Sequence, residues 1–126
     1  MTKKIINTLK APQAIGAYSQ AVQVDNTVYI SGQIGIDPQT MALVAGGFAA
    51  EAHQLLANLR AICEAAGGSL DKLVKLTVYL LDMHEFAQLN AIFQEFFQVP
   101  YPARAAIAVS ALPKGAVVEV DAVMVL

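Results

Sequence analysis

Short apolar and polar alternation in the first part of the chain is typical of β-strands. Residues 17–24 alternate loosely, and residues 27–31 are mostly β-branched or aromatic. Asp25-Asn26 lies between the two segments, and these residue types favour a turn. We therefore predict a β-hairpin here. A second turn at 37–40 and a break at Gly46-Gly47 follow it.

From Phe48 onward the apolar positions recur every three or four residues, which is the period of an α-helix. The first stripe consists of Phe48, Ala52, Leu55, Leu59, Ile62 and Ala66. Gly67-Gly68 is predicted to end this helix. After a nearly continuous apolar strand over 73–81, Asp82 is predicted to cap a second helix, with Glu85 three residues later. The second stripe consists of Phe86, Leu89, Phe93 and Phe96.

The last two predicted strands cover 103–109 and 117–126, joined near Leu112-Pro113-Lys114-Gly115. The order of elements indicates an α+β domain with two helices laid on a sheet. Two helices can cover only one face, yet the final strand is apolar on both faces. Val123 and Val125 share the second face with Glu119 and Asp121. Large uncovered apolar faces are rare on monomers, so we expect a homo-oligomer.

Composition narrows the function classes. The chain has 126 residues, 56% of them hydrophobic and 14% charged, and we expect one domain over 1–126. No apolar run approaches the roughly 20 residues of a membrane span, and the start does not read as a signal peptide. The net charge of −2 argues against nucleic acid as a partner. A single cysteine, Cys63, excludes an internal disulfide, so a cytoplasmic location is expected.

Arg104 is the only charged residue between Val99 and Leu112. A guanidinium stays protonated, and burying it without a partner costs several kcal/mol. One interpretation, the commoner arrangement, is an internal ion pair with Glu119 or Asp121. A simple hairpin of the last two strands would place Glu119 near Ala106, two residues from Arg104. The other interpretation is a site in which the planar guanidinium binds an anionic ligand.

The remaining polar candidates are less specific. Asn90 falls on the edge of the second helix stripe, and Tyr18 and Ser31 belong to the first hairpin. His53 and His84 lack metal-ligand spacing, so no metal site is predicted. Cys63 is expected to be a small core residue.

Five segments in register resemble the RidA (YjgF) family of reactive-intermediate deaminases, also described as the endoribonuclease L-PSP family. They are Ala14-Ile15-Gly16-Ala17-Tyr18-Ser19-Gln20-Ala21, Ile30-Ser31-Gly32-Gln33-Ile34, Phe86-Ala87-Gln88-Leu89-Asn90, Tyr101-Pro102-Ala103-Arg104, and Leu112-Pro113-Lys114-Gly115 followed by Val118-Glu119-Val120. The resemblance implies a chorismate mutase-like fold, with a single mixed sheet of about six strands and two helices on one face. It also implies a homotrimer with sites between subunits.

The same resemblance implies an activity: a cofactor-free hydrolase that converts 2-iminobutanoate, 2-iminopropanoate and the tautomeric enamine 2-aminoacrylate to 2-oxo acids and ammonia. Arg104 would hold the substrate carboxylate, and Glu119 would activate water. The other implied binding residues are Tyr18, Ser31, Gly32 (through its backbone), Asn90 and Ala106. Many relatives have cysteine where this chain has Ala106. Because the family uses the backbone amide of that residue toward the carboxylate, the resemblance implies that Ala106 still serves. The alternatives are a non-catalytic 2-oxo acid binder, a ribonuclease or translation inhibitor, and a purely structural oligomer with Arg104 in an ion pair.

Overall fold

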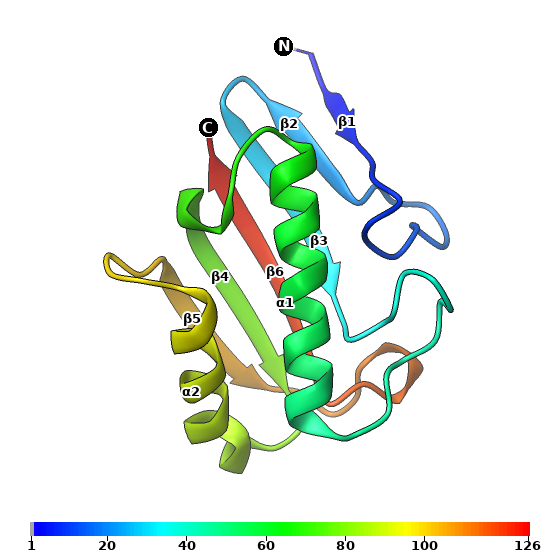
Figure 1. Cartoon of the computed structure of the whole chain (residues 1–126), viewed down its shortest axis with the longest axis vertical. Helices are drawn as coiled ribbons and strands as arrows, with labels where there is room; N and C mark the ends of the chain where they lie inside the picture. The colour runs from blue at the N-terminus through cyan, green and yellow to red at the C-terminus, as the bar shows by residue number, and fades with distance from the viewer. Residues whose placement is uncertain (1) are drawn as a thin grey trace.

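The computed structural model describes residues 2–126 and contains one six-stranded sheet with two α-helices on one of its faces (Figure 1). The strands are β1 (Lys4–Ile6), β2 (Ala21–Val24), β3 (Thr27–Gln33), β4 (Leu73–Leu80), β5 (Ala103–Ala108) and β6 (Val118–Val125). The helices are α1 (Phe48–Ala65) and α2 (Phe86–Phe96), with short 3₁₀ turns η1 (Leu70–Lys72), η2 (Met83–Glu85) and η3 (Pro113–Gly115). The predicted α+β fold is confirmed.

Local sequence signals set the element boundaries. β2 and β3 form the predicted antiparallel hairpin, with Asp25 in the left-handed region at φ 53°. α1 ends before Gly67, whose φ of 89° suits glycine. The Asp82 carboxylate accepts a hydrogen bond of 2.9 Å from the His84 backbone N–H, so Asp82 caps η2, and α2 follows from Phe86. β1 was not predicted, and it pairs with β2 at the sheet edge.

The apolar stripe of α1 forms the centre of the core. The stripe packs on the sheet with its apolar neighbours on the same helix, and several of these α1 side chains are completely buried, namely Leu55, Leu56, Leu59, Ile62 and Cys63. Burial of one such leucine or isoleucine stabilises the fold by about 1.5–3 kcal/mol. Cys63 is the core residue that the sequence predicted. Within residues 2–126, no helix is both long and apolar enough to cross a bilayer.

The strand order differs from the simple hairpin that we expected for the last two strands. The order is β1-β2-β3-β6-β4-β5, with β5 parallel to β4 and all other neighbours antiparallel. The helix α2 makes the crossover from β4 to β5, which makes those strands parallel neighbours. β6 lies on the other side of β4, between β4 and β3, and does not pair with the free edge of β5. The expected placement of Glu119 beside Ala106 is therefore wrong.

The sheet face without helices is apolar over much of its area. Tyr29, Ile107 and Val125 project from three different strands, and between 42% and 53% of each residue is exposed. Glu119, Asp121 and Val123 alternate with the buried positions of β6, so they lie on this face, as the sequence pattern predicts. A face of this kind is typical of a surface that another protein chain covers.

Candidate functional site

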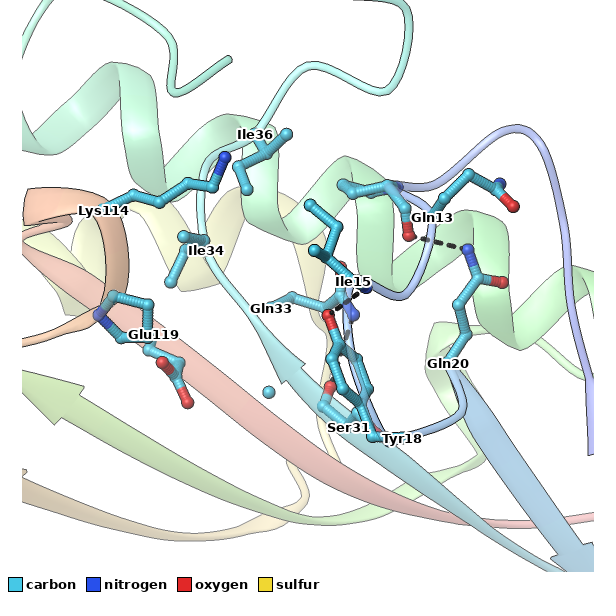
Figure 2. A pocket seen from close by; sticks show the side chains of 13 residues that line it. Gln13, Ile15, Tyr18, Gln20, Ser31, Gln33, Ile34, Ile36, Lys114 and Glu119 are labelled. Carbon is cyan, nitrogen blue, oxygen red and sulfur yellow. Dashed lines mark hydrogen bonds between the residues drawn. The ribbon is translucent and has the colours of Figure 1, made fainter. Parts of the chain in front are cut away.

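A cavity of about 500 Å³ lies at the end of β3, between the 12–20 segment and the 113–115 turn. Its lining consists of Pro12, Gln13, Ile15, Tyr18, Gln20, Ser31, Gly32, Gln33, Ile34, Ile36, Pro113, Lys114 and Glu119. Figure 2 shows the Glu119 carboxylate facing the region of Tyr18 and Ser31, with the Lys114 side chain reaching in from the neighbouring turn. We call this the Glu119 cavity.

The Glu119 carboxylate lies directly against the backbone of β3. The register between β3 and β6 shifts between Ile30 and Gln33, which brings Gly32 opposite the Glu119 side chain. A Cβ atom at position 32 would lie only 2.9 Å from the carboxyl carbon of Glu119. Ordinary carbon–carbon contacts are about 3.5–4.0 Å, so only glycine leaves the carboxylate where it is.

The 12–20 segment is fixed over the cavity by side-chain hydrogen bonds. The Tyr18 hydroxyl accepts from the Ile15 backbone N–H at 3.2 Å, and the Ser31 hydroxyl donates to the Ser19 carbonyl. Gln20, which is 2% exposed, accepts from the Thr8 N–H at 2.7 Å and donates to the Pro12 carbonyl at 2.8 Å. The segment has no regular secondary structure, and these bonds therefore shape one wall of the cavity.

Two polar residues of α1 fix the opposite wall. The Glu51 carboxylate, only 5% exposed, accepts from the Val117 N–H at 2.9 Å. The Asn58 amide donates to the carbonyls of Ile36 at 2.9 Å and Ile34 at 3.4 Å. The bond to Val117 positions the start of β6, because Val117 precedes Glu119 by two residues. The bonds to Ile34 and Ile36 position two residues that line the cavity. Neither Glu51 nor Asn58 was predicted, although both fall on one helix face with buried apolar positions.

The environment of Glu119 increases its affinity for a proton. Burial raises the pKa of the Glu119 carboxyl, and the nearby charge of Asp121 raises it further. Asp121 accepts a hydrogen bond of 2.7 Å from the Tyr79 hydroxyl. That bond, with lesser effects of burial and carboxylate charge, raises the pKa of Tyr79 to about 12. A carboxyl whose pKa moves toward neutrality is suited to general acid–base catalysis.

Arg104 lies elsewhere, in a second cavity of about 400 Å³. That cavity is lined by Leu76, Asn90, Phe93, Gln94, Phe97, Tyr101, Pro102 and Arg104. The guanidinium carbon lies 5.1 Å from the ring centroid of Phe86 and 5.6 Å from that of Phe93, both on α2. Among residues 2–126 Arg104 forms no ion pair with a carboxylate, and Asp121 bonds to Tyr79 instead. The expected internal ion pair is therefore not formed.

The predicted site residues thus fall into two groups within one chain. Tyr18, Ser31, Gly32 and Glu119 line the first cavity, and Asn90 and Arg104 line the second. Arg104 shares the helix-covered side of the sheet with its partner Leu76, whereas Glu119 lies on the open side. Ala106 lines neither cavity; it pairs with Val78 and packs against the core.

The polar residues of the Glu119 cavity that sequence reasoning missed are three amides and Lys114. Gln13, Gln20 and Gln33 belong to the segments quoted for the family resemblance or adjoin them, and that adjacency is the signal that could have found them. Within residues 2–126 no group of three His, Cys, Asp or Glu side chains is arranged to hold a metal ion. His53 and His84 are exposed.

Known proteins resemble this chain over nearly its whole length. A family profile described as "Endoribonuclease L-PSP" matches residues 8–126. The mouse protein named 2-iminobutanoate/2-iminopropanoate deaminase is 54% identical over 123 residues, which cover 98% of this chain and 91% of the mouse protein.

Solved structures agree with this relationship. RidA from an Antarctic Psychrobacter has a TM-score of 0.95 at 56% identity, covering 98% of this chain and 99% of the other. The Escherichia coli protein TdcF, solved with bound serine, has a TM-score of 0.93 at 40% identity, covering 98% of each chain. The profile match and these identities show that the chain belongs to the endoribonuclease L-PSP family, which includes the RidA proteins.

Proposed function

We propose that this protein is a hydrolase that converts 2-imino acids, such as 2-iminobutanoate and 2-iminopropanoate, to 2-oxo acids and ammonia. Relatives with 50–54% identity are named for this activity. The observation that carries the proposal for this chain is the Glu119 carboxyl, which is half-buried in a cavity and has a raised pKa. The bound serine of the TdcF structure supports a ligand with an α-carboxylate and an α-nitrogen.

The proposed reaction needs water and one carboxylate that exchanges a proton. Glu119 takes a proton from water while the water oxygen bonds to the iminium carbon, whose C=N π electrons move to nitrogen. The tetrahedral carbinolamine then receives that proton on nitrogen. The C–N bond breaks and ammonia leaves as the C=O bond forms, while the regenerated Glu119 carboxylate takes the hydroxyl proton and passes it to the released ammonia. General base assistance of this kind contributes typically about 10²–10⁴-fold. No electrons are exchanged with a redox partner, so no cofactor is required.

Arg104 is the proposed binding group for the substrate carboxylate. The guanidinium presents a planar fork that matches a carboxylate with two parallel hydrogen bonds. Its aromatic neighbours Phe86 and Phe93 restrict its orientation without neutralising it. Asn90 lines the same cavity and would contribute an amide contact, and the Ala106 N–H is the proposed backbone donor. Tyr18, Ser31 and the Gly32 backbone would contact the substrate from the other cavity.

Because Arg104 and Glu119 lie on opposite sides of one sheet, we propose that each active site combines two subunits of a homotrimer. The sheets would face inward and the helices outward, which covers the apolar face that carries Tyr29, Ile107 and Val125. A closed ring of three identical contacts joins one patch of each subunit to a different patch of the next. The Glu119 cavity of one protomer would thereby meet the Arg104 cavity of its neighbour.

The experiment is imine hydrolysis with substrates generated in situ by an amino-acid oxidase or a serine or threonine dehydratase. The parent should accelerate release of the 2-oxo acid and ammonia over the solution rate. Arg104→Lys keeps the charge but loses the fork, so its kcat/KM should fall mainly through KM. Glu119→Gln should lower kcat far more than its affinity for a 2-oxo acid.

Subunit mixing tests the shared site. An Arg104→Lys and a Glu119→Gln subunit are each defective, but a mixed ring contains some contacts at which both intact groups meet. Random assembly of equal amounts should restore roughly one quarter of the parental activity in a symmetric ring. If mixed and refolded subunits stay as inactive as the two variants, or if the parent sediments as a monomer at micromolar concentration, the shared site is wrong.

The family's description raises ribonuclease activity as an alternative. Binding to RNA depends on clusters of lysine and arginine, whereas the eight basic residues here are scattered along a chain with a net charge of −2. A non-catalytic 2-oxo acid binder would keep Arg104 but would not depend on Glu119.

We propose that the protein acts in the cytoplasm, where a free thiol such as that of Cys63 stays reduced.

A further inference from the structure

Three polar side chains meet on the open face of the sheet beside the Glu119 cavity. Glu119 and Asp121 are two residues apart on β6 and therefore project from the same face. Tyr79 on β4 is the register partner of Glu119, and its hydroxyl donates a 2.7 Å hydrogen bond to Oδ2 of Asp121. Tyr79 thus lies opposite Glu119 on the neighbouring strand while its hydroxyl bonds to Asp121.

Among the described residues, Asp121 is the one negatively charged group that acts on Glu119. On β3 the facing residues are Ser31 and Gly32, which carry no charge. The cavity wall contributes the Tyr18 hydroxyl and the Lys114 ammonium, and Lys114 forms no ion pair with Glu119 among the described residues.

We propose that Asp121 is a positioning residue for the hydrolysis: the Tyr79 hydrogen bond holds its carboxylate on the same face of the sheet as Glu119, where its negative charge assists the proton transfers of Glu119. The inference rests on the proposed function, because it assigns a use to the same carboxyl. Two charges spaced by two strand residues, about 7 Å, still interact near a protein surface, where the effective dielectric constant is about 20.

The chemistry explains why such a neighbour is useful. In the proposed reaction Glu119 first accepts a proton from water and then returns it to the departing amine. A carboxylate of ordinary proton affinity is a weak base near neutral pH, whereas one with increased affinity performs both transfers more readily. Asp121 remains an acceptor of the Tyr79 hydrogen bond and does not exchange protons with the substrate. Burial contributes to the raised pKa of Glu119 as well, so Asp121 accounts for only part of it.

The test compares Asp121→Asn with the parent by two measurements. The first is a carbon-13 NMR titration of the Glu119 carboxyl carbon, whose signal is assigned by its loss in Glu119→Gln. The second is the pH dependence of kcat/KM for an imine generated in situ. Removing the Asp121 charge should shift the titration of Glu119 to lower pH. The acid limb of the rate profile should move in the same direction, because the general base is then deprotonated at lower pH.

Matched variants separate this role from general effects of charge. Asp71→Asn removes one negative charge from an exposed position on η1 and should leave both measurements unchanged. Asp121→Glu restores a carboxylate and should move both midpoints back toward those of the parent. If Asp121→Asn does not fold, Asp121→Ser provides a smaller neutral side chain with the same expected shift.

The proposal is overturned if a folded, neutral variant at 121 leaves the Glu119 titration unchanged, or if Asp71→Asn shifts it equally. Failure of the proposed function has a different signature: the parent then shows no imine hydrolysis, while the NMR titration still reports whether the two carboxyls are coupled. A shift in the titration without movement of the rate profile would also refute the role, since Glu119 would be coupled to Asp121 without serving as the base.

Discussion

Substitution of Gly32 by alanine should separate activity from stability. A methyl group at this position would lie 2.9 Å from the carboxyl carbon of Glu119, against an ordinary carbon–carbon contact of about 3.5–4.0 Å. The carboxylate must therefore move by about 1 Å. It can do so at small cost in stability, because it is the end of a flexible side chain and Gly32 does not have a positive φ.

The expected loss is in catalysis. Displacing a catalytic group by about 1 Å can cost on the order of 10²-fold in rate, which corresponds to roughly 2.7 kcal/mol in the activation barrier. The melting temperature should stay close to that of the parent, because Gly→Ala at a permitted backbone conformation even stabilises a chain by about 0.4–1 kcal/mol through the unfolded state. The assays are kcat/KM for an imine generated in situ and a thermal melt.

Gly35 provides the matched control, three residues further along the same segment. A Cβ there would lie 2.7 Å from Cα and 2.8 Å from the carbonyl oxygen of Glu51. These are backbone atoms of α1 and cannot yield, so Gly35→Ala should destabilise the fold by about 1–3 kcal/mol. Its activity per folded molecule should fall less than that of Gly32→Ala. The reasoning is refuted if Gly32→Ala retains kcat/KM within about threefold, a small fraction of the predicted ~10²-fold loss.

The remaining predictions concern ionisation and the core. Alkaline titration of tyrosinate absorbance should contain a step near pH 12 that disappears in Tyr79→Phe, because the pKa of Tyr79 is raised to about 12 by its hydrogen bond to Asp121. Cys63, whose pKa burial raises to about 12, should react with a thiol reagent at pH 8 only after denaturant unfolds the chain; rapid labelling of the folded protein would contradict this. Leu55→Ala, at a fully buried position, should lower the free energy of unfolding by about 2–5 kcal/mol, measured by urea denaturation.

The helices were predictable from the sequence because their signals are local. The stripe from Phe48 contains five of the nine buried residues of α1, and Gly67 marks the end of the helix through a backbone conformation that other residues avoid. The β2–β3 hairpin was predictable for the same reason, since Asp25-Asn26 determines a turn between neighbouring segments. β1 is only three residues long, too short for a periodic pattern.

Strand order was not predictable from local signals. Leu112 to Gly115 has the composition of a tight turn, which favours direct pairing of the strands on either side. The actual pairing follows from α2, which returns the chain parallel to β4 and occupies that edge with β5. β6 then pairs with β4 and β3. A rule about crossovers, applied before the turn chemistry, would have given the parallel pairing of β4 with β5.

The residues of the candidate site were predictable, but their grouping was not. The family motifs name Arg104 and Glu119 without saying that one lies on each side of the sheet. Within an isolated chain Arg104 faces aromatic rings, and no residue pattern along the sequence reports that arrangement. Glu51 and Asn58 were missed because their hydrogen bonds go to backbone groups of distant segments, which leave no mark in the local pattern.

The hydrogen bonds that Glu51 and Asn58 make also determine how parts of the molecule open. The Val117 amide proton and the carbonyls of Ile34 and Ile36 are bound to side chains of α1 and not to a neighbouring strand. Exchange of the Val117 amide with deuterium therefore requires release from the helix. Its protection should follow that of α1, so the helix and the start of β6 behave as one cooperative unit although more than fifty residues separate Val117 from the end of α1.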